Sequence, residues 1–173
     1  ISNRRETSRW PLVAFGQAAD ALRERLDLTI ALSWAPGDRS NPLFPGDDSN
    51  AEEVARHMRT PPVLLRTPEL DDLIAAVAVS DFVLSTDGGL MHIAAALDVP
   101  QVVLFGRTDP RHWAPVSQKS AVLQRGPRVE AISVDEVVAA ATAVMARWGR
   151  EDIAVSPSWS RPSGRPRPPE DRE

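Results

Sequence analysis

The chain contains no cysteine, so it has neither a disulfide framework nor a thiolate metal site. The absence of cysteine fits a reducing compartment. Long apolar stretches are also missing: the longest uncharged apolar runs are residues 73–80, 88–97 and 137–146. Each is far shorter than the roughly 18 residues needed to cross a bilayer. We therefore expect no transmembrane segment and no secretory signal segment.

An excess of positive charge is absent too. The net charge is −4, and residues 155–173 carry four arginines against three acidic residues, which leaves −5 on residues 1–154. Nucleic-acid binding needs clustered lysine and arginine to neutralise phosphates, so we expect no nucleic-acid partner. The local exception is the start of the chain, where Arg4, Arg5 and Arg9 lie close together.

The length of 173 residues suits one α/β domain with a tail. We predict a domain over residues 1–154. Residues 155–173 contain five prolines, four arginines and few apolar groups, which predicts a disordered tail. The first residue is Ile1 rather than methionine, so we expect the chain to be a piece of a longer protein.

Helical and strand patterns alternate along the chain. The predicted helices cover residues 12–26, 51–58, 90–97 and 133–148, and one further helix is predicted after Thr67, which would be its N-cap. The predicted strands cover residues 28–34, 63–65, 81–85, 101–105 and 121–123. Ser133 and Glu136 predict a capping box. Residues 35–49 are rich in proline, glycine and aspartate, which predicts a long loop. The alternation predicts a Rossmann-like α/β fold, a parallel sheet with helices on both faces.

The most informative motif is the glycine turn in residues 85–92, which read Ser-Thr-Asp-Gly-Gly-Leu-Met-His. In doubly wound sheets, ligands bind beyond the carboxyl ends of the strands. Gly88 and Gly89 let a ligand approach the backbone, and the following helix presents unpaired N–H groups that suit a phosphate. His92 lies one turn into that helix and is a candidate donor to a phosphate oxygen.

Asp87 requires a different role, because a carboxylate beside a phosphate is repelled. We interpret it as an acceptor for the amides of the turn, or as a helix N-cap. The pattern leaves another interpretation open, in which residues 85–92 are only a strand-to-helix turn and His92 is a core histidine.

Residues 73–115 resemble the signature region of the ADP-heptose:lipopolysaccharide heptosyltransferase family, glycosyltransferase family 9. The matching residues are Asp87, Gly89, His92, the helix over 93–97, Pro100, Leu104-Phe105-Gly106, Thr108-Asp109-Pro110, Trp113 and Pro115. The pair Trp10-Pro11 before the first helix also matches. The resemblance covers roughly residues 1–148.

This resemblance implies that the chain is the C-terminal half of a GT-B glycosyltransferase, with the N-terminal acceptor domain missing. The implied function is binding of an ADP-heptose-like donor for inverting transfer in lipopolysaccharide or cell-surface glycan synthesis. The general base is expected in the missing domain, and neither a metal nor another cofactor is expected. The chain alone should therefore bind donor weakly and transfer nothing.

The resemblance also implies the site residues. The expected substrate-binding residues are Ser8, Arg9, Thr67, Pro68, Asp87, Gly88, Gly89, Leu90, His92, Arg107, Thr108 and Asp109. Of these, His92 and Asp87 are the expected catalytic residues. The amides of residues 88–90, together with His92 and Arg9, are expected to stabilise the leaving diphosphate.

The sequence departs from the family pattern at three positions. The family has serine or threonine where this chain has Gly88, lysine where it has Ser8, and proline where it has Arg107. Arg9 or Arg5 is a candidate to replace the lysine charge. These departures bear on the identity of the donor more than on the fold.

The ribose of the donor needs an acidic residue in the loop after the strand at 28–34. Asp38, Asp47, Asp48 and Glu52 are all candidates, and a solvated surface charge is the competing interpretation of each. Thr67 and Pro68 match a loop that borders the base.

The implied partners are the nucleotide-sugar donor and, through the missing domain, a lipid-linked or saccharide acceptor. The implied location is the cytoplasm, with peripheral association at the cytoplasmic face of the inner membrane left open. One alternative function is a non-catalytic sugar-nucleotide-binding module. Another is a GT-B enzyme such as a UDP-sugar 2-epimerase, for which His57 and His112 would be the further histidines to consider.

Overall fold

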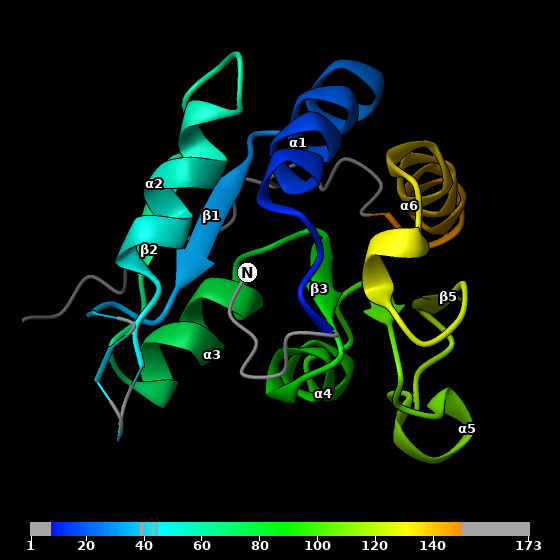
Figure 1. The fold of residues 1–173 in the computed structure, drawn as a ribbon. Coiled ribbons are helices and arrows are strands. Elements are labelled where there is room, and N and C mark those ends of the chain that lie inside the picture. The colour runs from blue at the N-terminus through cyan, green and yellow to red at the C-terminus, as the bar shows by residue number, and fades with distance from the viewer. Residues whose placement is uncertain (1–7, 39, 42, 44, 150–173) are drawn as a thin grey trace, which may run out of the picture.

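Parallel strands flanked by helices make up the computed structural model, which describes residues 8–38, 40, 41, 43 and 45–149 (Figure 1). The helices are α1 (Leu12–Leu26), α2 (Asp48–Arg56), α3 (Leu70–Ala78), α4 (Gly89–Ala96), α5 (Pro110–Trp113), the 3₁₀ turn η2 (Val129–Ala131) and α6 (Val134–Trp148). The strands are β1 (Ala31–Trp34), β2 (Val63–Arg66), β3 (Val83–Thr86), β4 (Gln101–Phe105) and β5 (Ser120–Gln124). The predicted α/β class is confirmed.

The strands divide into two sheets rather than one. Strands β1 and β2 form a parallel pair, and β3, β4 and β5 form a parallel sheet in that order. Among the residues that the structure describes, no ladder joins β1 to β3. The fold class therefore holds, while the single sheet expected from the sequence is interrupted at its middle.

Strand β4 lies at the centre of the larger sheet and is buried along its whole length. Val102 and Leu104 belong to the core that α1 and α6 cover, whereas Val103 and Phe105 pack with Met91 of α4 on the opposite face. Successive side chains of a strand point to opposite faces, so a strand covered on both sides needs an unbroken apolar run. This burial explains why residues 101–105 were predicted correctly from composition.

Capping chemistry sets the beginnings of α6 and α3. The predicted box at α6 is confirmed, since the Ser133 amide donates to the Glu136 carboxylate at 2.9 Å and the Glu136 amide donates to the Ser133 hydroxyl at 3.3 Å. The prediction that Thr67 caps the next helix is wrong. That helix, α3, begins after Glu69, which forms its own capping box with Asp72.

Thr67 is buried and has a different partner. Its hydroxyl donates to the Trp34 carbonyl at 3.0 Å, and its amide donates to the same oxygen at 3.0 Å. The residue therefore extends the β1–β2 ladder instead of opening a helix. Pro68 and Glu69 separate Thr67 from the first turn of α3, so its hydroxyl is too far along the chain to cap the helix.

The predicted tail at 155–173, the domain boundary at 154, and Arg4 and Arg5 all lie outside the described residues. Within the described ranges, no helix combines the length and apolar character that crossing a bilayer requires.

The start of α1 is held by the indole of Trp10. Its Nε1 donates to the Ile132 carbonyl at 2.9 Å, and its ring meets Phe15 edge-on with centroids 5.0 Å apart. Trp10 is almost wholly buried. The bond joins residues 122 positions apart, so it ties the segment before α1 to the segment before α6.

Replacing Trp10 with phenylalanine should lower the free energy of unfolding by about 1–3 kcal/mol, because the Ile132 carbonyl loses its donor inside the core. Urea denaturation measures the change. Trp113→Phe is the control: Trp113 is 59% exposed, so the change there should stay within about 0.5 kcal/mol. Equal losses for the two variants would contradict the structural role of the Trp10 bond.

Stability should also depend on pH through Glu136. Donors from the backbone and hydroxyl of Ser133, and then from Arg125, lower the pKa of this carboxyl from 4.5 to about 2. A carboxyl with a lowered folded-state pKa contributes stability that is complete above its unfolded value and disappears as pH falls toward its folded value. Wild type and Glu136→Gln should therefore differ in unfolding midpoint at neutral pH and converge as the pH falls from 4.5 to about 2. A difference that is constant with pH would show that the carboxylate charge contributes nothing.

Candidate functional site

The carboxyl ends of the strands gather most of the predicted site residues at one edge of the fold. Thr67 follows β2, the Asp87–Gly89 corner follows β3, and residues 107–109 follow β4. In Figure 1 the arrow of β1 points to the edge where α3, α4 and α5 lie, and the segment that leads into α1 reaches the same edge. This is the edge at which doubly wound folds bind ligands.

The glycine corner lies between β3 and α4. The Asp87 amide donates to the Leu104 carbonyl at 2.9 Å, which holds the start of the turn against β4. Gly88 and Gly89 are both exposed. A Cβ built on Gly89 would meet no atom within 4 Å, and one on Gly88 would meet only the Thr86 carbonyl oxygen at 3.8 Å. Within the described ranges, therefore, no side chain fills the corner, and Gly88 and Gly89 are exposed there.

The first turn of α4 supplies the anion-binding groups of this corner. The first amides of a helix lack intrahelical partners and carry partial positive charge, which suits a phosphate. The N-cap is Gly88, in an extended conformation with φ 174°, and glycine has no side chain with which to cap the helix. The prediction that Asp87 is the N-cap is thus wrong, because Gly88 separates it from the helix. Its other predicted role, as acceptor for amides of the turn, stays a prediction.

His92 is exposed on α4, so the alternative that it is a core histidine does not hold. Leu90 is half-buried and packs against the cluster of Val77, Val83, Ala94 and Val99. Leu90 therefore anchors the helix, and its contribution to a ligand would come from its amide.

A second loop, residues 106–109, follows the neighbouring strand β4. The side-chain nitrogen Nε2 of Gln124, at the end of β5, donates to the backbone carbonyls of Gly106 at 2.5 Å and Thr108 at 3.0 Å. These bonds hold the backbone on either side of Arg107, whose side chain is exposed. Sequence reasoning missed Gln124, although a polar amide closing an apolar strand is the kind of residue that anchors a loop.

Asp109 organises the end of this loop. Its carboxylate accepts from the Arg111 amide at 2.9 Å, which caps the short helix α5, and from the Arg111 guanidinium at 2.7 Å. The side-chain bond from Arg111 is the main cause that lowers the pKa of Asp109 to about 2. A carboxyl so acidic is a poor proton acceptor near neutral pH. Asp109 therefore fits a structural role at the site rather than that of a general base.

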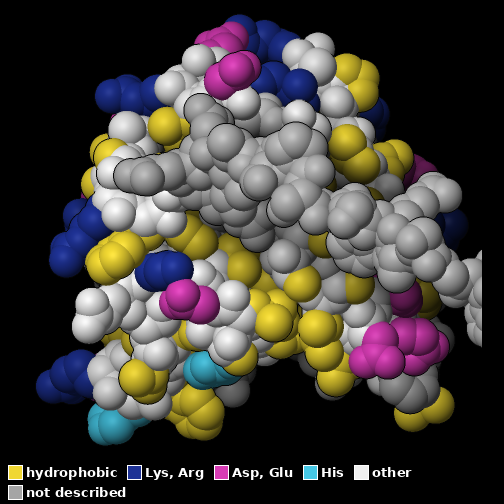
Figure 2. Space-filling model, turned by 180° about the vertical axis from the view of Figure 1, so that it is seen from behind, with side chains coloured by type: hydrophobic (Ala, Val, Ile, Leu, Met, Phe, Trp, Pro, Cys, Tyr) yellow, Lys and Arg dark blue, Asp and Glu magenta, His cyan; other side chains and the backbone are white. Residues whose placement is uncertain are grey.

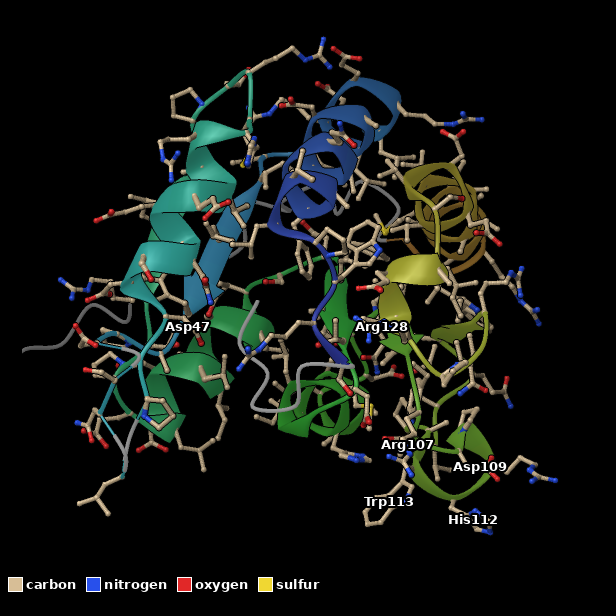
Figure 3. The ribbon with its side chains drawn as sticks, in the orientation of Figure 1. Asp47, Arg107, Asp109, His112, Trp113 and Arg128 are labelled. Atoms are coloured by element: carbon tan, nitrogen blue, oxygen red, sulfur yellow. The ribbon has the colours of Figure 1, made fainter. Side chains whose placement is uncertain are left out.

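Helix α5 was not predicted, although Asp109 followed by Pro110 is a recognisable helix start. Figure 3 shows Arg107, Asp109, His112 and Trp113 grouped around this helix, with His112 directed outward. His112 is exposed, and its Nδ1 lies 3.5 Å from the Asp109 carboxylate. His57 follows α2, at the end of that helix remote from the strands' carboxyl edge.

The two predicted residues before α1 differ in accessibility. Ser8 is buried, with 1% of its surface exposed, whereas Arg9 is partly exposed. The Ser8 hydroxyl is thus covered in this structure, and a cation at this end of the site would come from Arg9.

The loop after β1 is pinned by Asp48, one of its four acidic candidates. The Asp48 carboxylate accepts from the Trp34 indole at 2.7 Å and from the Gly37 amide at 3.0 Å, and Arg66 lies 3.3 Å away. The Trp34 bond is the largest cause of its lowered pKa. These partners show that Asp48 holds the loop onto the end of β1.

The other acidic residues of this loop and of α2 have fewer hydrogen-bond partners than Asp48. Asp47 pairs with the side-chain amide of Asn50, Asp38 accepts from the Ser40 amide at 2.6 Å, and Glu52 is exposed on α2. Figure 3 places Asp47 beside β1 and β2, on the opposite side of the structure from Arg107. In the described part of the chain, no group of three or more His, Asp or Glu residues is arranged to hold a metal ion.

A cavity of about 660 Å³ has Leu90, beside the glycine corner, among its lining residues. The rest of its lining is mainly apolar and comes mostly from α1, β1, β2, α3 and β3. Figure 2 shows hydrophobic side chains along a hollow on the rear face of the molecule. The structure therefore brings the residues after β3 and β4 together and leaves those after β1 and β2 across a gap.

Comparison with known proteins shows which family the chain matches. Residues 2–139 match the family model described as glycosyltransferase family 9 (heptosyltransferase). The chain is 38% identical over 117 residues to lipopolysaccharide heptosyltransferase 2 of Escherichia coli K12, and 27% identical over 117 residues to that of Salmonella typhimurium LT2. Each alignment covers 67% of this chain and 32% of the relative, so the chain spans about a third of the length of these curated relatives.

Solved structures share the fold. The glycosyl transferase family 9 protein of Veillonella parvula DSM 2008 superposes with a TM-score of 0.72 at 22% identity, covering 85% of this chain and 44% of that one. The E. coli heptosyltransferase WaaC with ADP gives a TM-score of 0.70 at 22% identity, covering 83% and 42% respectively.

The space around Gly89 predicts how a substitution there will change the free energy of unfolding. Gly89→Ala should change the unfolding free energy by no more than about 1 kcal/mol, and in the stabilising direction, because alanine is preferred in helices and its Cβ meets nothing. Gly46→Ala should instead destabilise the protein strongly, since its Cβ would lie 2.3 Å from the Gly37 backbone. Urea denaturation of both variants is the measurement. Unfolding by Gly89→Ala would show that the corner is closed.

Proposed function

Because the chain belongs to glycosyltransferase family 9 (heptosyltransferase), we propose that it is the donor-binding part of an inverting glycosyltransferase that uses an ADP-heptose-like nucleotide sugar. The observation that carries the proposal is the unfilled backbone corner at Gly88 and Gly89, located at the carboxyl end of β3. An anion at that point would meet the start of α4 without displacing the side chain of any described residue.

The pyrophosphate of the donor would bind the amides of residues 88–90. His92, one turn along α4, is exposed and available as a donor, and Arg107 and Arg9 supply positive charge from the neighbouring loop and from the start of α1. Thr108 and Asp109 would shape the loop that carries Arg107. The helix amides, His92 and the two arginines can each offer a hydrogen bond or a positive charge to a phosphate oxygen.

The chemistry that this arrangement serves is departure of the nucleoside diphosphate. An acceptor hydroxyl attacks the anomeric carbon from the face opposite the diphosphate, the bond from that carbon to the diphosphate oxygen breaks, and the hydroxyl proton passes to a general base. Positive charge develops on the sugar ring and negative charge on the leaving oxygens. A preorganised donor aimed at such charge is worth about 3–4 kcal/mol of barrier.

The described residues offer donors to the leaving group but no evident base. The bond from Arg111 lowers the pKa of Asp109 to about 2, which makes it a poor proton acceptor, and Asp87 is half-buried behind the glycine corner. We therefore assign the base and the saccharide or lipid-linked acceptor to the polypeptide that the longer relatives possess beyond this region. A cytoplasmic location, at the inner face of the membrane, belongs to the same proposal and rests on the family alone.

The adenosine would extend toward the loop after β1. Asp48 is occupied with Trp34, Gly37 and Arg66, so Asp47 and Asp38 are the better candidates for a ribose hydroxyl. Thr67 and Pro68 lie beside this loop at the end of β2, where they would border the base. ADP is a suitable probe because the solved E. coli relative contains it, and another solved form contains ADP-2-deoxy-2-fluoro heptose.

A second candidate function is a non-catalytic sugar-nucleotide-binding module. The burial of Ser8, at the position where the family has a lysine, favours it, because a buried hydroxyl cannot take over that lysine's charge. Gly88 likewise offers no hydroxyl to a phosphate.

Nucleotide binding by the purified chain tests the proposal. ADP at 100 times its dissociation constant should stabilise the fold by about 2.7 kcal/mol, seen as a rise in unfolding midpoint. His92→Ala should reduce this rise and leave the midpoint without ADP unchanged, because the side chain is exposed. His57→Ala, at the remote end of α2, is the matched control and should keep the full ADP response.

The outcomes separate the candidate functions. A larger response to UDP than to ADP would favour an epimerase-like enzyme, and no response to any nucleotide would leave only a structural module. If His92→Ala lowers the midpoint without ADP, the histidine supports the fold and its assignment to the site fails.

A further inference from the structure

Strand β4 begins with a glutamine and is otherwise apolar. Gln101 has none of its surface exposed, and the residues that follow it in β4 are Val-Val-Leu-Phe. A strand covered on both faces is normally apolar throughout, because a polar group loses its water there. An apolar side chain at this position would continue the pattern, so the contacts of the glutamine must account for its presence.

The side-chain amide of Gln101 uses both of its donor hydrogens. Its Nε2 lies 2.9 Å from the backbone carbonyl of Met91 in α4 and 3.0 Å from the hydroxyl of Ser120 in β5. A backbone carbonyl can only accept, so the nitrogen of the amide, and not its oxygen, faces Met91. With partners in two different elements, the planar amide is fixed in orientation and ties α4 to the β4–β5 ladder.

The oxygen of the same amide has no such partner. Within the described ranges, the Oε1 atom of Gln101 is buried and accepts no hydrogen bond. A buried acceptor without a partner lowers stability, whereas replacing polar groups by apolar ones of the same shape is often nearly neutral. Stability therefore does not explain the glutamine, and its bond to Met91 is the contact to which a role can be assigned.

Met91 is the third residue of α4, in the turn whose amides form the glycine corner. The N-cap residue, Gly88, has no side chain and so does not fix this turn. A capping side chain would also occupy the amides that an anion needs. The first turn must therefore be held through groups other than its amides, and the Met91 carbonyl is such a group.

Apolar packing alone holds α4 less strictly than a hydrogen bond does. The side chain of Met91 is almost wholly buried against Val103 and Phe105, but the second half of the helix is Ile-Ala-Ala-Ala. Apolar contacts have no direction, and alanines present a smooth surface along which a helix can slide. A hydrogen bond of 2.9 Å from a fixed amide sets both the position of α4 along its axis and its rotation.

We propose that Gln101 is a positioning residue of the candidate site, which holds the first turn of α4 where its amides and His92 meet the diphosphate. This inference rests on the proposed function for the identity of the ligand and on the Gln101 contacts for the mechanism. Gln101 itself touches no ligand, since it is fully buried at the amino end of β4. Its effect passes through Met91, because donors that bind a ligand must be held within about 0.5 Å of their productive positions.

Gln101→Met tests the proposal, because methionine has a similar length and no hydrogen-bond donor. Calorimetric titration should show ADP binding weakened roughly fivefold or more, while the unfolding midpoint changes by no more than about 3 °C. Ser120→Ala removes the other partner of the amide and keeps the bond to Met91, so it should bind ADP like wild type. Val144→Ala, in the core that α1 and α6 cover, should lower the midpoint and keep the affinity for ADP.

Amide exchange without nucleotide gives an independent measurement. Exchange at Ala95 and Ala96, in the last turn of α4, should be several-fold faster in Gln101→Met than in wild type and unchanged in α6, because only α4 loses a tie to the sheet. If wild type binds no ADP while α4 still exchanges faster in Gln101→Met, the proposed function fails and the role of Gln101 in holding α4 is supported.

Two results would overturn the positioning role. One is equal affinity of wild type and Gln101→Met for ADP, which would leave the proposed function intact. The other is a loss of affinity in Val144→Ala as large as that in Gln101→Met, since binding would then follow overall stability. Gln101→Leu, which is apolar and shorter, repeats the test if the methionine variant does not fold.

Discussion

The hydrogen bond from the Asp87 amide to the Leu104 carbonyl, 2.9 Å long, closes the parallel ladder between β3 and β4 at its carboxyl end. Parallel alignment requires every strand to finish at the same edge, so the turn at Gly88 and the loop at Arg107 become neighbours although 18 residues separate them. The burial of β4 on both faces makes this edge rigid. The parallel alignment of β3 and β4 therefore positions the candidate site, and the side chains act on that backbone arrangement.

Around this edge, most carboxylates are already engaged by the fold. Asp48 holds the loop after β1 through the Trp34 indole, and Asp109 caps α5 and pairs with Arg111. What is left exposed beside the glycine corner is a set of donors: helix amides, His92 and Arg107. A site composed of donors suits a phosphate-bearing leaving group and leaves proton removal to groups elsewhere. This division agrees with a chain that spans about a third of its relatives' length.

The parallel strands form two separate sheets, and this separation divides the candidate site as well. Gln124, at the end of β5, holds the loop after β4, and the Asp87 amide holds the end of β3 to β4, whereas a cavity is lined by both β1 and β3. On the proposed function, a nucleotide bound at the glycine corner would have to span this gap to reach the loop after β1. The relative position of the two halves therefore decides whether both ends of one ligand can be held at once.

Local patterns determined much of this protein from the sequence alone: the extent of α1, the run of β4, the capping box of α6 and the placement of Gly88 and Gly89 after a strand. These features depend on neighbours within a few residues, through helical periodicity, burial on both faces of a strand and cap hydrogen bonds. Tertiary structure decided the partner of Thr67, the engagement of Asp48, the anchoring role of Gln124 and the gap between β1 and β3. Each of those rests on contacts between segments distant in sequence, and a hydrogen-bonding side chain does not reveal in its local sequence which distant group it will meet.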